Sequence, residues 1–332
     1  MIKKSQKLNR NLFSVDVEQE SIRQGFGKGL LQAAKKDERV VGLCADLTES
    51  TRMHFFRNAF PHRFVEIGIA EQNLASVASG MAAMGKIPFI SSYAMFNPGR
   101  NWEQIRTTIC YNNVPVKIVG SHAGVSVGKD GGTHQAIEDI AIMRVLPRIV
   151  VVVPCDSEEA RKATLALAKT DTPVYLRLAR EKTPIITTKD TPFKIGQSDV
   201  LFEPKKGIKK KIGIIACGSL VYNALVVASE LEKENIGVSV LKLSTIKPLD
   251  EDGILEFSKK HEGLVTVEEH QVAGGMGGAI SEFISQNNPI KMGFIGVQDK
   301  FGQSGTQEEL IKHYGMDTVS IKKKIKEVIK KK

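Results

Sequence analysis

The most regular feature of the chain is a series of short apolar runs, rich in β-branched residues and separated by stretches with helical spacing. These runs are 40–45, 114–120, 149–153, 174–178, 212–216, 238–243, 264–267 and 294–297. Nearly continuous apolar strands of this kind are buried on both faces, as in parallel sheets covered by helices. Leu74, Val77, Ala78 and Met81 repeat with helical spacing instead. The pattern therefore predicts an α/β protein with mostly parallel sheets covered by helices.

A break in this pattern divides the chain. No period is visible between Glu181 and Gln197, where two prolines flank a polar cluster. A chain of 332 residues is long enough for two domains of about 150 residues each. We therefore predict an N-terminal extension (1–14), a first domain (15–183), a linker (184–196) and a second domain (197–332).

Composition and charge exclude several classes of protein. The net charge is +10, but many of the lysines lie in 205–211 and 322–332 without interleaved aromatic residues. We expect these runs to be a solvated loop and a frayed chain end rather than a nucleic-acid surface. The longest apolar runs are far shorter than the roughly 20 residues that cross a bilayer, and no apolar segment follows the basic N-terminus. With four scattered cysteines and no metal spacing, the chain is expected to be cytoplasmic, without membrane or nucleic-acid partners.

One carboxylate stands at the start of a predicted helix. Glu71 follows a strand end at Glu66-Ile67 and begins the helical pattern around Leu74. An acidic side chain in the first turn is stabilised by the helix dipole by about 0.3–1 kcal/mol. On spacing alone, Glu71 is either an ordinary helix-start acid or a functional carboxylate.

A glycine-rich loop carries two histidines and an aspartate. It follows the apolar run that ends at Gly120 and contains His122, Asp130 and His134. Ligands of open α/β sheets bind at loops after the carboxyl ends of parallel strands. The three side chains could therefore contact a polyhydroxy substrate, or they could be incidental to a tight turn. Their spacing does not match common zinc motifs, so we predict no metal site.

Two further segments leave strands with side chains suited to a ligand. Tyr93 and Phe96 could face a flat heterocycle or simply pack in the core. Arg177 and Arg180 close another strand, where alternation places them on opposite faces, so only one can enter a given site. A surface salt bridge is the alternative for these arginines.

Taken together and in this order, the segments resemble the transketolase family from about Val15 to the end of the chain. The resemblance is carried by ordered motifs in both halves. These are 45–50, 68–73, 128–135, 247–250, 267–270 and 302–309. Membership would imply a pyrimidine-binding domain over 15–183 and a transketolase C-terminal domain over 197–332.

The resemblance also implies roles for individual residues, with thiamine diphosphate as cofactor. Glu71 matches the glutamate that hydrogen-bonds N1′ of the cofactor's aminopyrimidine and so promotes deprotonation of its thiazolium ring. The aromatic residues that flank the pyrimidine match Tyr93 and Phe96. The residues that line the sugar channel match His122, Asp130 and His134, and the histidines would move protons or stabilise oxyanions. The ligands of the substrate phosphate match Arg23, Ser50 and Arg180.

One departure from the family pattern changes the expected assembly. Full-length members hold the diphosphate and Mg²⁺ through Gly-Asp-Gly and a downstream Asn, and this chain contains no Gly-Asp-Gly. The chain therefore resembles the C-terminal subunit of a split transketolase. Its expected partners are an N-terminal subunit, which would hold the Mg²⁺ and share the cofactor, and a second copy of itself in a heterotetramer. The expected reaction is transfer of a two-carbon ketol unit between sugar phosphates.

Three other interpretations remain open. Deoxyxylulose-phosphate synthase shares the Ala-Glu-Gln and Thr-His-Gln strings but is normally one long chain. Beta chains of 2-oxo-acid dehydrogenases share the two-domain plan without the histidine pattern of the sugar channel. A non-catalytic regulatory subunit is a different class, and the retained Glu71, His122, Asp130 and His134 argue against it.

Overall fold

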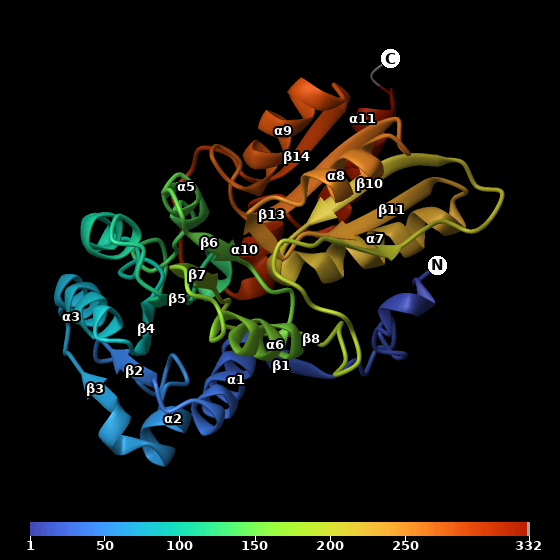
Figure 1. The fold of residues 1–332 in the computed structure, drawn as a ribbon. Helices are drawn as coiled ribbons and strands as arrows, with labels where there is room; N and C mark the ends of the chain where they lie inside the picture. The colour runs from blue at the N-terminus through green and yellow to red at the C-terminus, as the bar shows by residue number, and fades with distance from the viewer. Residues whose placement is uncertain (331–332) are drawn as a thin grey trace.

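The first half of the chain folds into a seven-stranded sheet, seen in a computed structural model that describes residues 1–330 (Figure 1). The strand order is β12-β6-β7-β5-β4-β2-β3, and all neighbours are parallel except β12 and β6. The strand bounds are β2 (Val40–Cys44), β3 (Phe64–Glu66), β4 (Ile87–Tyr93), β5 (Lys117–Ser121), β6 (Val150–Val152), β7 (Val174–Arg177) and β12 (Thr245–Lys247). This is the mostly parallel sheet that the apolar runs predict.

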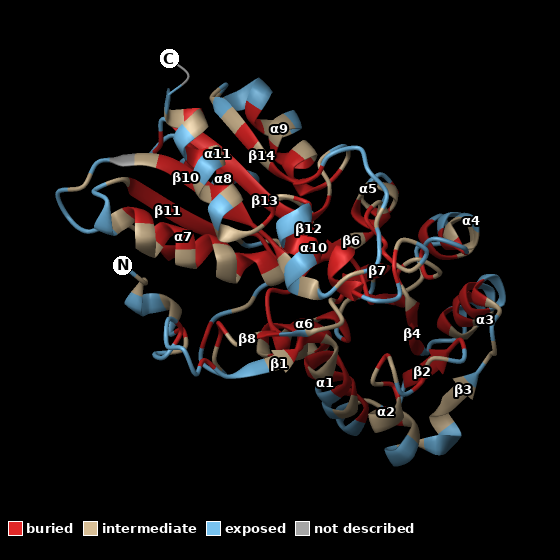
Figure 2. Ribbon diagram, turned by 180° about the vertical axis from the view of Figure 1, so that it is seen from behind, coloured by how far each residue is buried: buried red, intermediate tan, exposed pale blue. Residues whose placement is uncertain are grey.

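Helices cover both faces of this sheet. On one face α1 (Ile22–Lys36) packs along α6 (Ser157–Leu167), where Phe26, Leu30 and Leu167 are buried (Figure 1). The other face packs against α3 (Glu71–Ala83) and the π-helical turn η3 (Ile105–Cys110). Except for the edge strand β3, the strands are largely buried between helices whose outer faces are exposed (Figure 2). The predicted helix around Leu74 is confirmed as α3.

The second half forms a five-stranded sheet in the order β14-β13-β10-β11-β9, parallel except for β11 and β9. The strand bounds are β9 (Asp199–Phe202), β10 (Lys210–Ala216), β11 (Gly237–Lys242), β13 (Gly263–Gln271) and β14 (Lys291–Val297). Helices α7 (Val221–Lys233) and α11 (Thr318–Lys330) pack on one face, whereas α8 (Glu251–Ser258) and α9 (Met276–Asn287) pack on the other. All eight apolar runs therefore lie in or overlap strands of the two sheets.

Short segments tie the two sheets together. Strand β12 comes from the second half of the chain yet pairs with β6 of the first sheet. Strands β1 (Gln19–Ser21) and β8 (Lys182–Pro184) form a separate antiparallel pair. The first residues of the chain bond to the edge of the second sheet, where Lys3 N donates to Leu201 O at 2.9 Å.

The remaining elements are short. Their bounds are η1 (Lys4–Gln6), α2 (His54–Ala59), η2 (Pro61–Arg63), α4 (Trp102–Gln104), η4 (Val125–Val127), α5 (Asp139–Arg144), η5 (Gly218–Leu220) and α10 (Gln307–His313). Among the described residues, no helix combines the length and apolarity needed to cross a membrane. All four cysteines are free thiols inside the protein.

The lysine-rich C-terminus differs from the frayed end that its composition predicts. Up to Lys330 it forms helix α11, and Ile321, Ile325 and Val328 are buried against the second sheet. Their i, i+4, i+7 spacing gives the helix one apolar face, and the lysines lie outside it. Lys331 and Lys332 lie outside the described residues.

Candidate active site

The predicted site residues gather at one edge of the first sheet. Ser50 follows β2, Glu71 follows β3, Tyr93 ends β4, His122 follows β5 and Arg180 follows β7. These five strands are parallel, so their carboxyl ends share one edge. That edge is where open α/β sheets place ligands.

Glu71 is the first residue of α3, and its side chain is buried, with 1% exposed. One carboxylate oxygen, Oε2, accepts a hydrogen bond from Arg100 Nη1 at 2.9 Å. The other, Oε1, lies 3.4 Å from Ser92 Oγ, which is a weak contact. The backbone carbonyl of Glu71 accepts from Asn101 Nδ2 at 3.0 Å. Glu71 is therefore a fixed, buried carboxylate with accepting capacity left on Oε1.

Arg100 is a member of this site that the sequence did not single out. Besides its ion pair with Glu71, its guanidinium carbon lies 4.7 Å from the centre of the Phe96 ring. The side chain is half exposed, so it stands at the mouth of the site. Spacing alone could not identify Arg100, because the pairing depends on where β3 and β4 lie in the sheet.

Four rings form a continuous cluster that Arg100 links to this carboxylate. The Tyr93 ring stacks near Phe96 at 6.3 Å between centroids and lies 3.8 Å from the His122 ring. The His134 ring meets the edges or faces of both aromatic rings, at 6.0 Å from Tyr93 and 5.5 Å from Phe96. The register of β4 and β5 places Tyr93 opposite Ser121, which explains why His122 reaches it.

His122 is buried and neutral. Burial, and then the positive charges of Arg23 and Arg180, lower its pKa to about 2. Its Nδ1 lies 2.8 Å from Ser121 Oγ, and its Nε2 lies 3.5 Å from Arg23 Nη1. A guanidinium can only donate, so Nε2 is assigned as the acceptor and Nδ1 as the protonated nitrogen.

Arg23, Ser50 and Arg180 also meet. Arg23 Nε donates to the carbonyl of Arg180 at 3.1 Å, and its Nη1 donates to the carbonyl of Ser50. Arg180 in turn donates to Val127 O and lies 3.8 Å from the Asp130 carboxylate.

A third arginine, which the sequence did not single out, approaches the same group. Arg52 adopts a left-handed backbone conformation (φ 68°), and its backbone lies so close to Gly27 of α1 that a Cβ there would collide with it. Burial, followed by repulsion from Arg52 and Arg180, lowers the pKa of Arg23. Within residues 1–330, neither Arg23 nor Arg52 forms an ion pair with a carboxylate, so this cationic cluster is suited to an external anion.

All nine predicted site residues are thus joined by contacts, with Arg100 as the link between Glu71 and Phe96. Arg177, by contrast, points away from this site and is buried in an ion pair with Asp139 rather than on the surface. Arg177 and Arg180 therefore have different partners, and only Arg180 belongs to this site.

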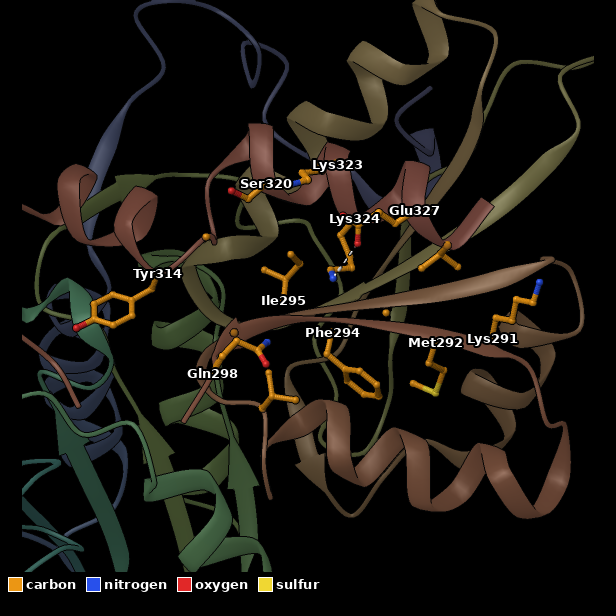
Figure 3. A pocket seen from close by; sticks show the side chains of 15 residues that line it. Lys291, Met292, Phe294, Ile295, Gln298, Tyr314, Ser320, Lys323, Lys324 and Glu327 are labelled. Atoms are coloured by element: carbon orange, nitrogen blue, oxygen red, sulfur yellow. Dashed lines mark ion pairs between the residues drawn. The ribbon is translucent and has the colours of Figure 1, made fainter. Parts of the chain in front are cut away.

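A large groove lies elsewhere in the molecule. It has a volume of about 700 Å³ and runs beside the edge strand β14 and helix α11 (Figure 3). Lys291, Lys323 and Lys324 line it, together with the strand backbone, and it includes no predicted site residue. Lysines commonly protect exposed sheet edges from pairing with other chains, which explains this groove without a ligand.

Comparison with known proteins finds a matching family model for each half of the chain. The family model described as transketolase, pyrimidine binding domain, matches residues 18–185, and the one described as transketolase, C-terminal domain, matches residues 203–321. A protein of Methanocaldococcus jannaschii named putative transketolase C-terminal section is 42% identical over 93% of this chain and 96% of its own length. A 6-deoxy-6-sulfo-D-fructose transketolase subunit from a Clostridium species is 36% identical over 96% of this chain and 98% of its own.

A solved structure agrees with these sequence comparisons. It is described as a split gene transketolase, inactive beta4 tetramer, and is 39% identical with a TM-score of 0.86. The match covers 93% of this chain and 98% of the solved one.

Proposed function

Because the chain belongs to the transketolase family and matches its pyrimidine-binding and C-terminal domains, we propose that it is the C-terminal subunit of a thiamine diphosphate-dependent transketolase. In this proposal it transfers a two-carbon ketol unit between ketose and aldose phosphates, together with a separate N-terminal subunit. The observation that carries the proposal is the buried Glu71 carboxylate, which Arg100 joins to the Phe96 ring next to Tyr93. The related split-gene tetramer, which contains only beta chains and is described as inactive, supports the need for a second kind of subunit.

The residues present fit the pyrimidine end of the cofactor. An aminopyrimidine is flat, which suits aromatic faces, and its ring nitrogen can share a proton with a carboxylate oxygen that has free accepting capacity. When bound, thiamine diphosphate supplies the carbanion chemistry that breaks and forms the carbon–carbon bond. In residues 1–330, no group of three or more His, Cys, Asp or Glu side chains is placed to hold a metal ion. Because this chain contains no Gly-Asp-Gly, with which full-length members of the family hold the diphosphate and Mg²⁺, we assign both to the N-terminal subunit.

Glu71 would hold the pyrimidine through a proton shared between a ring nitrogen and Oε1, the oxygen with only the 3.4 Å contact to Ser92. Arg100 would keep the carboxylate in place through Oε2. Glu71 also begins a rigid helix, so the carboxylate is oriented before a ligand arrives.

The histidines and the arginine cluster would bind the substrate. His122, Asp130 and His134 would contact the sugar hydroxyls, and the neutral, accepting Nε2 of His122 favours hydrogen bonding over proton donation at pH 7. The terminal phosphate would lie against Arg23, Ser50 and Arg180, with Arg52 as an added cation. The sulfonated sugar named for the Clostridium relative carries another terminal anion that such a cluster could bind.

The decisive experiment combines the purified chain with an N-terminal subunit that carries Gly-Asp-Gly, thiamine diphosphate and Mg²⁺. Transfer from xylulose 5-phosphate to an aldose phosphate is then measured for wild type, Glu71→Gln and the exposed control Glu103→Gln. We expect Glu71→Gln to lose activity at least about 100-fold without a change in secondary structure, and the control to stay near wild type. A fully active Glu71→Gln pair would exclude Glu71 from the mechanism, and efficient use of pyruvate would favour a deoxyxylulose-phosphate synthase instead.

A further inference from the structure

A loop of the first domain docks onto the carboxyl edge of the second sheet. This loop, residues 122–136, is called the histidine loop here because it carries His122 and His134. Its two ends meet in a bridge between Ala123 and Ala136, and Gly124 N donates to Ala136 O at 2.8 Å. Its central turn, η4, lies against α10 and the end of β13, where a ligand would bind in an open α/β sheet.

Glu269, near the end of β13, makes the central contact with this loop. Its carboxylate is buried, and Oε1 accepts a hydrogen bond from the backbone N–H of Ser126 at 2.6 Å. Its other oxygen accepts from Ser219 Oγ at 3.1 Å. Gly124 has a φ of +89°, and a Cβ at that position would collide with the Glu269 carboxylate. The loop backbone is therefore shaped to this one side chain.

A second contact holds the far side of the loop. Gln135 Nε2 donates to Val125 O at 2.8 Å and to Gln303 O at 2.9 Å. The backbone at Gly132 approaches the carbonyl of Gly302 so closely that a Cβ would not fit. Gln303 and Gly302 belong to the segment between β14 and α10, so the second domain holds the histidine loop from two directions.

We propose that Glu269 is a positioning residue for the active site, and that the C-terminal domain sets the placement of the side chains that bind the sugar. The Ser126 amide lies in the middle of the histidine loop and depends on Glu269 for its partner. If the carboxylate is removed, that amide is buried without an acceptor and the loop must shift. This inference rests on the proposed function, because it assumes that His122, Asp130 and His134 contact the substrate.

The neighbouring Glu268 provides a matched control. It is equally buried on the same strand, but its carboxylate accepts from the backbone N–H groups of Met276 at 2.6 Å and Gly277 at 2.8 Å, at the start of α9. Glu268→Ala therefore removes a comparable set of hydrogen bonds without touching the histidine loop.

Kinetics of the reconstituted pair test the proposal. We expect Glu269→Ala to raise the KM for the ketose phosphate about tenfold to hundredfold, since a displacement of about 1 Å can cost that much. Affinity for thiamine diphosphate should stay within about twofold of wild type, because Glu71 and Phe96 lie outside the loop. Glu268→Ala should leave both constants unchanged, and Glu269→Gln, which keeps an acceptor for Ser126, should recover most of the wild-type KM.

Hydrogen exchange gives a readout that does not need activity. In the full-length chain, Glu269→Ala should speed amide exchange within 122–136, whereas Glu268→Ala should not. If the wild-type pair proves inactive, the proposed function fails while this measurement still decides whether Glu269 positions the loop. Should Glu269→Ala not fold, Glu269→Asp shortens the side chain by one carbon and carries the same expectations. Identical KM and identical exchange in the Glu269 and Glu268 variants would overturn the proposal.

Discussion

The buried ion pair between Arg177 and Asp139 makes a quantitative prediction about stability. Both side chains are at least 94% buried, and Arg177 Nε donates to Asp139 Oδ2 at 2.7 Å. Arg177 Nη2 also donates to the carbonyls of Ala136 at 3.2 Å and Glu269 at 2.8 Å, which joins the two domains. Although burial opposes ionisation, the charge of Arg177 keeps the pKa of Asp139 below its usual value. Arg177→Met would therefore leave a charged carboxylate without its counterion.

The expected cost follows from what remains around that carboxylate. Breaking a buried pair by removing one partner typically costs about 3–5 kcal/mol. Tyr175 OH still donates to Asp139 Oδ2 at 2.6 Å, which retains part of the solvation. We therefore expect Arg177→Met to lower the free energy of unfolding by about 3 kcal/mol, at the lower end of that range. Changing Asp139 to Asn in the same chain removes the unpaired charge and should recover part of that loss.

Urea unfolding followed by circular dichroism measures these differences. Glu282→Gln is the control, because Glu282 forms an ion pair with Arg144 that also spans the two domains but is itself 63% exposed. Such a pair contributes about 0–1 kcal/mol. If Arg177→Met costs no more than this control, or if the double variant is no more stable than the single one, the reasoning about buried charge is wrong.

Three further predictions concern binding of the substrate anion, stability at acidic pH and the contact between Asp156 and the linker. Arg23→Met in the reconstituted pair should raise the KM for phosphorylated substrates at least about tenfold with a smaller change in kcat, because it removes a charge-assisted contact; an unchanged KM would exclude Arg23 from the phosphate site. Burial lowers the pKa of His270 in the folded chain to about 4. As the pH falls, this histidine is protonated in the unfolded chain before it is protonated in the folded chain. The free energy of unfolding should therefore fall between about pH 6.5 and 4, by up to about 3 kcal/mol. Unfolding curves of His270→Gln should depend less on pH in that window, and equal dependence would contradict the assignment. Asp156 caps α6 by accepting from Glu159 N at 2.7 Å, and it also accepts from Ile186 N in the linker at 2.8 Å. Asp156→Ala should therefore lower the free energy of unfolding, measured by thermal unfolding, by about 2 kcal/mol or more. A loss below about 0.5 kcal/mol would mean that water replaces these hydrogen bonds.

Much of the active site could be predicted because its parts are local motifs attached to predictable elements. The eight apolar runs identify strands of both sheets, and the residues that follow them identify the loops at the carboxyl edge. Glu71 at the start of α3 and the histidines after β5 are of this kind. The resemblance to transketolases added roles to these positions, which spacing alone could not supply.

Contacts between distant segments could not be predicted in the same way. Nothing in the local sequence distinguishes Arg100 from the other arginines, yet strand order places its guanidinium against Glu71, 29 residues earlier in the chain. Arg52 joins the arginine cluster because Gly27 lets its loop approach α1. The lysine-rich tail was expected to be frayed, but up to Lys330 it forms α11, whose apolar face packs against the second sheet.

Short-range spacing along the chain is enough to specify the periodic elements, the mostly parallel sheets and the chemistry available at the strand ends. Which of those ends meet, and which buried charges have partners, is specified only when the chain has folded. Glu269 illustrates the difference: in the sequence it is one of two adjacent glutamates, and in the folded chain it is the acceptor that holds the histidine loop. Pairings across more than a hundred residues depend on sheet order and domain docking, which no local pattern specifies.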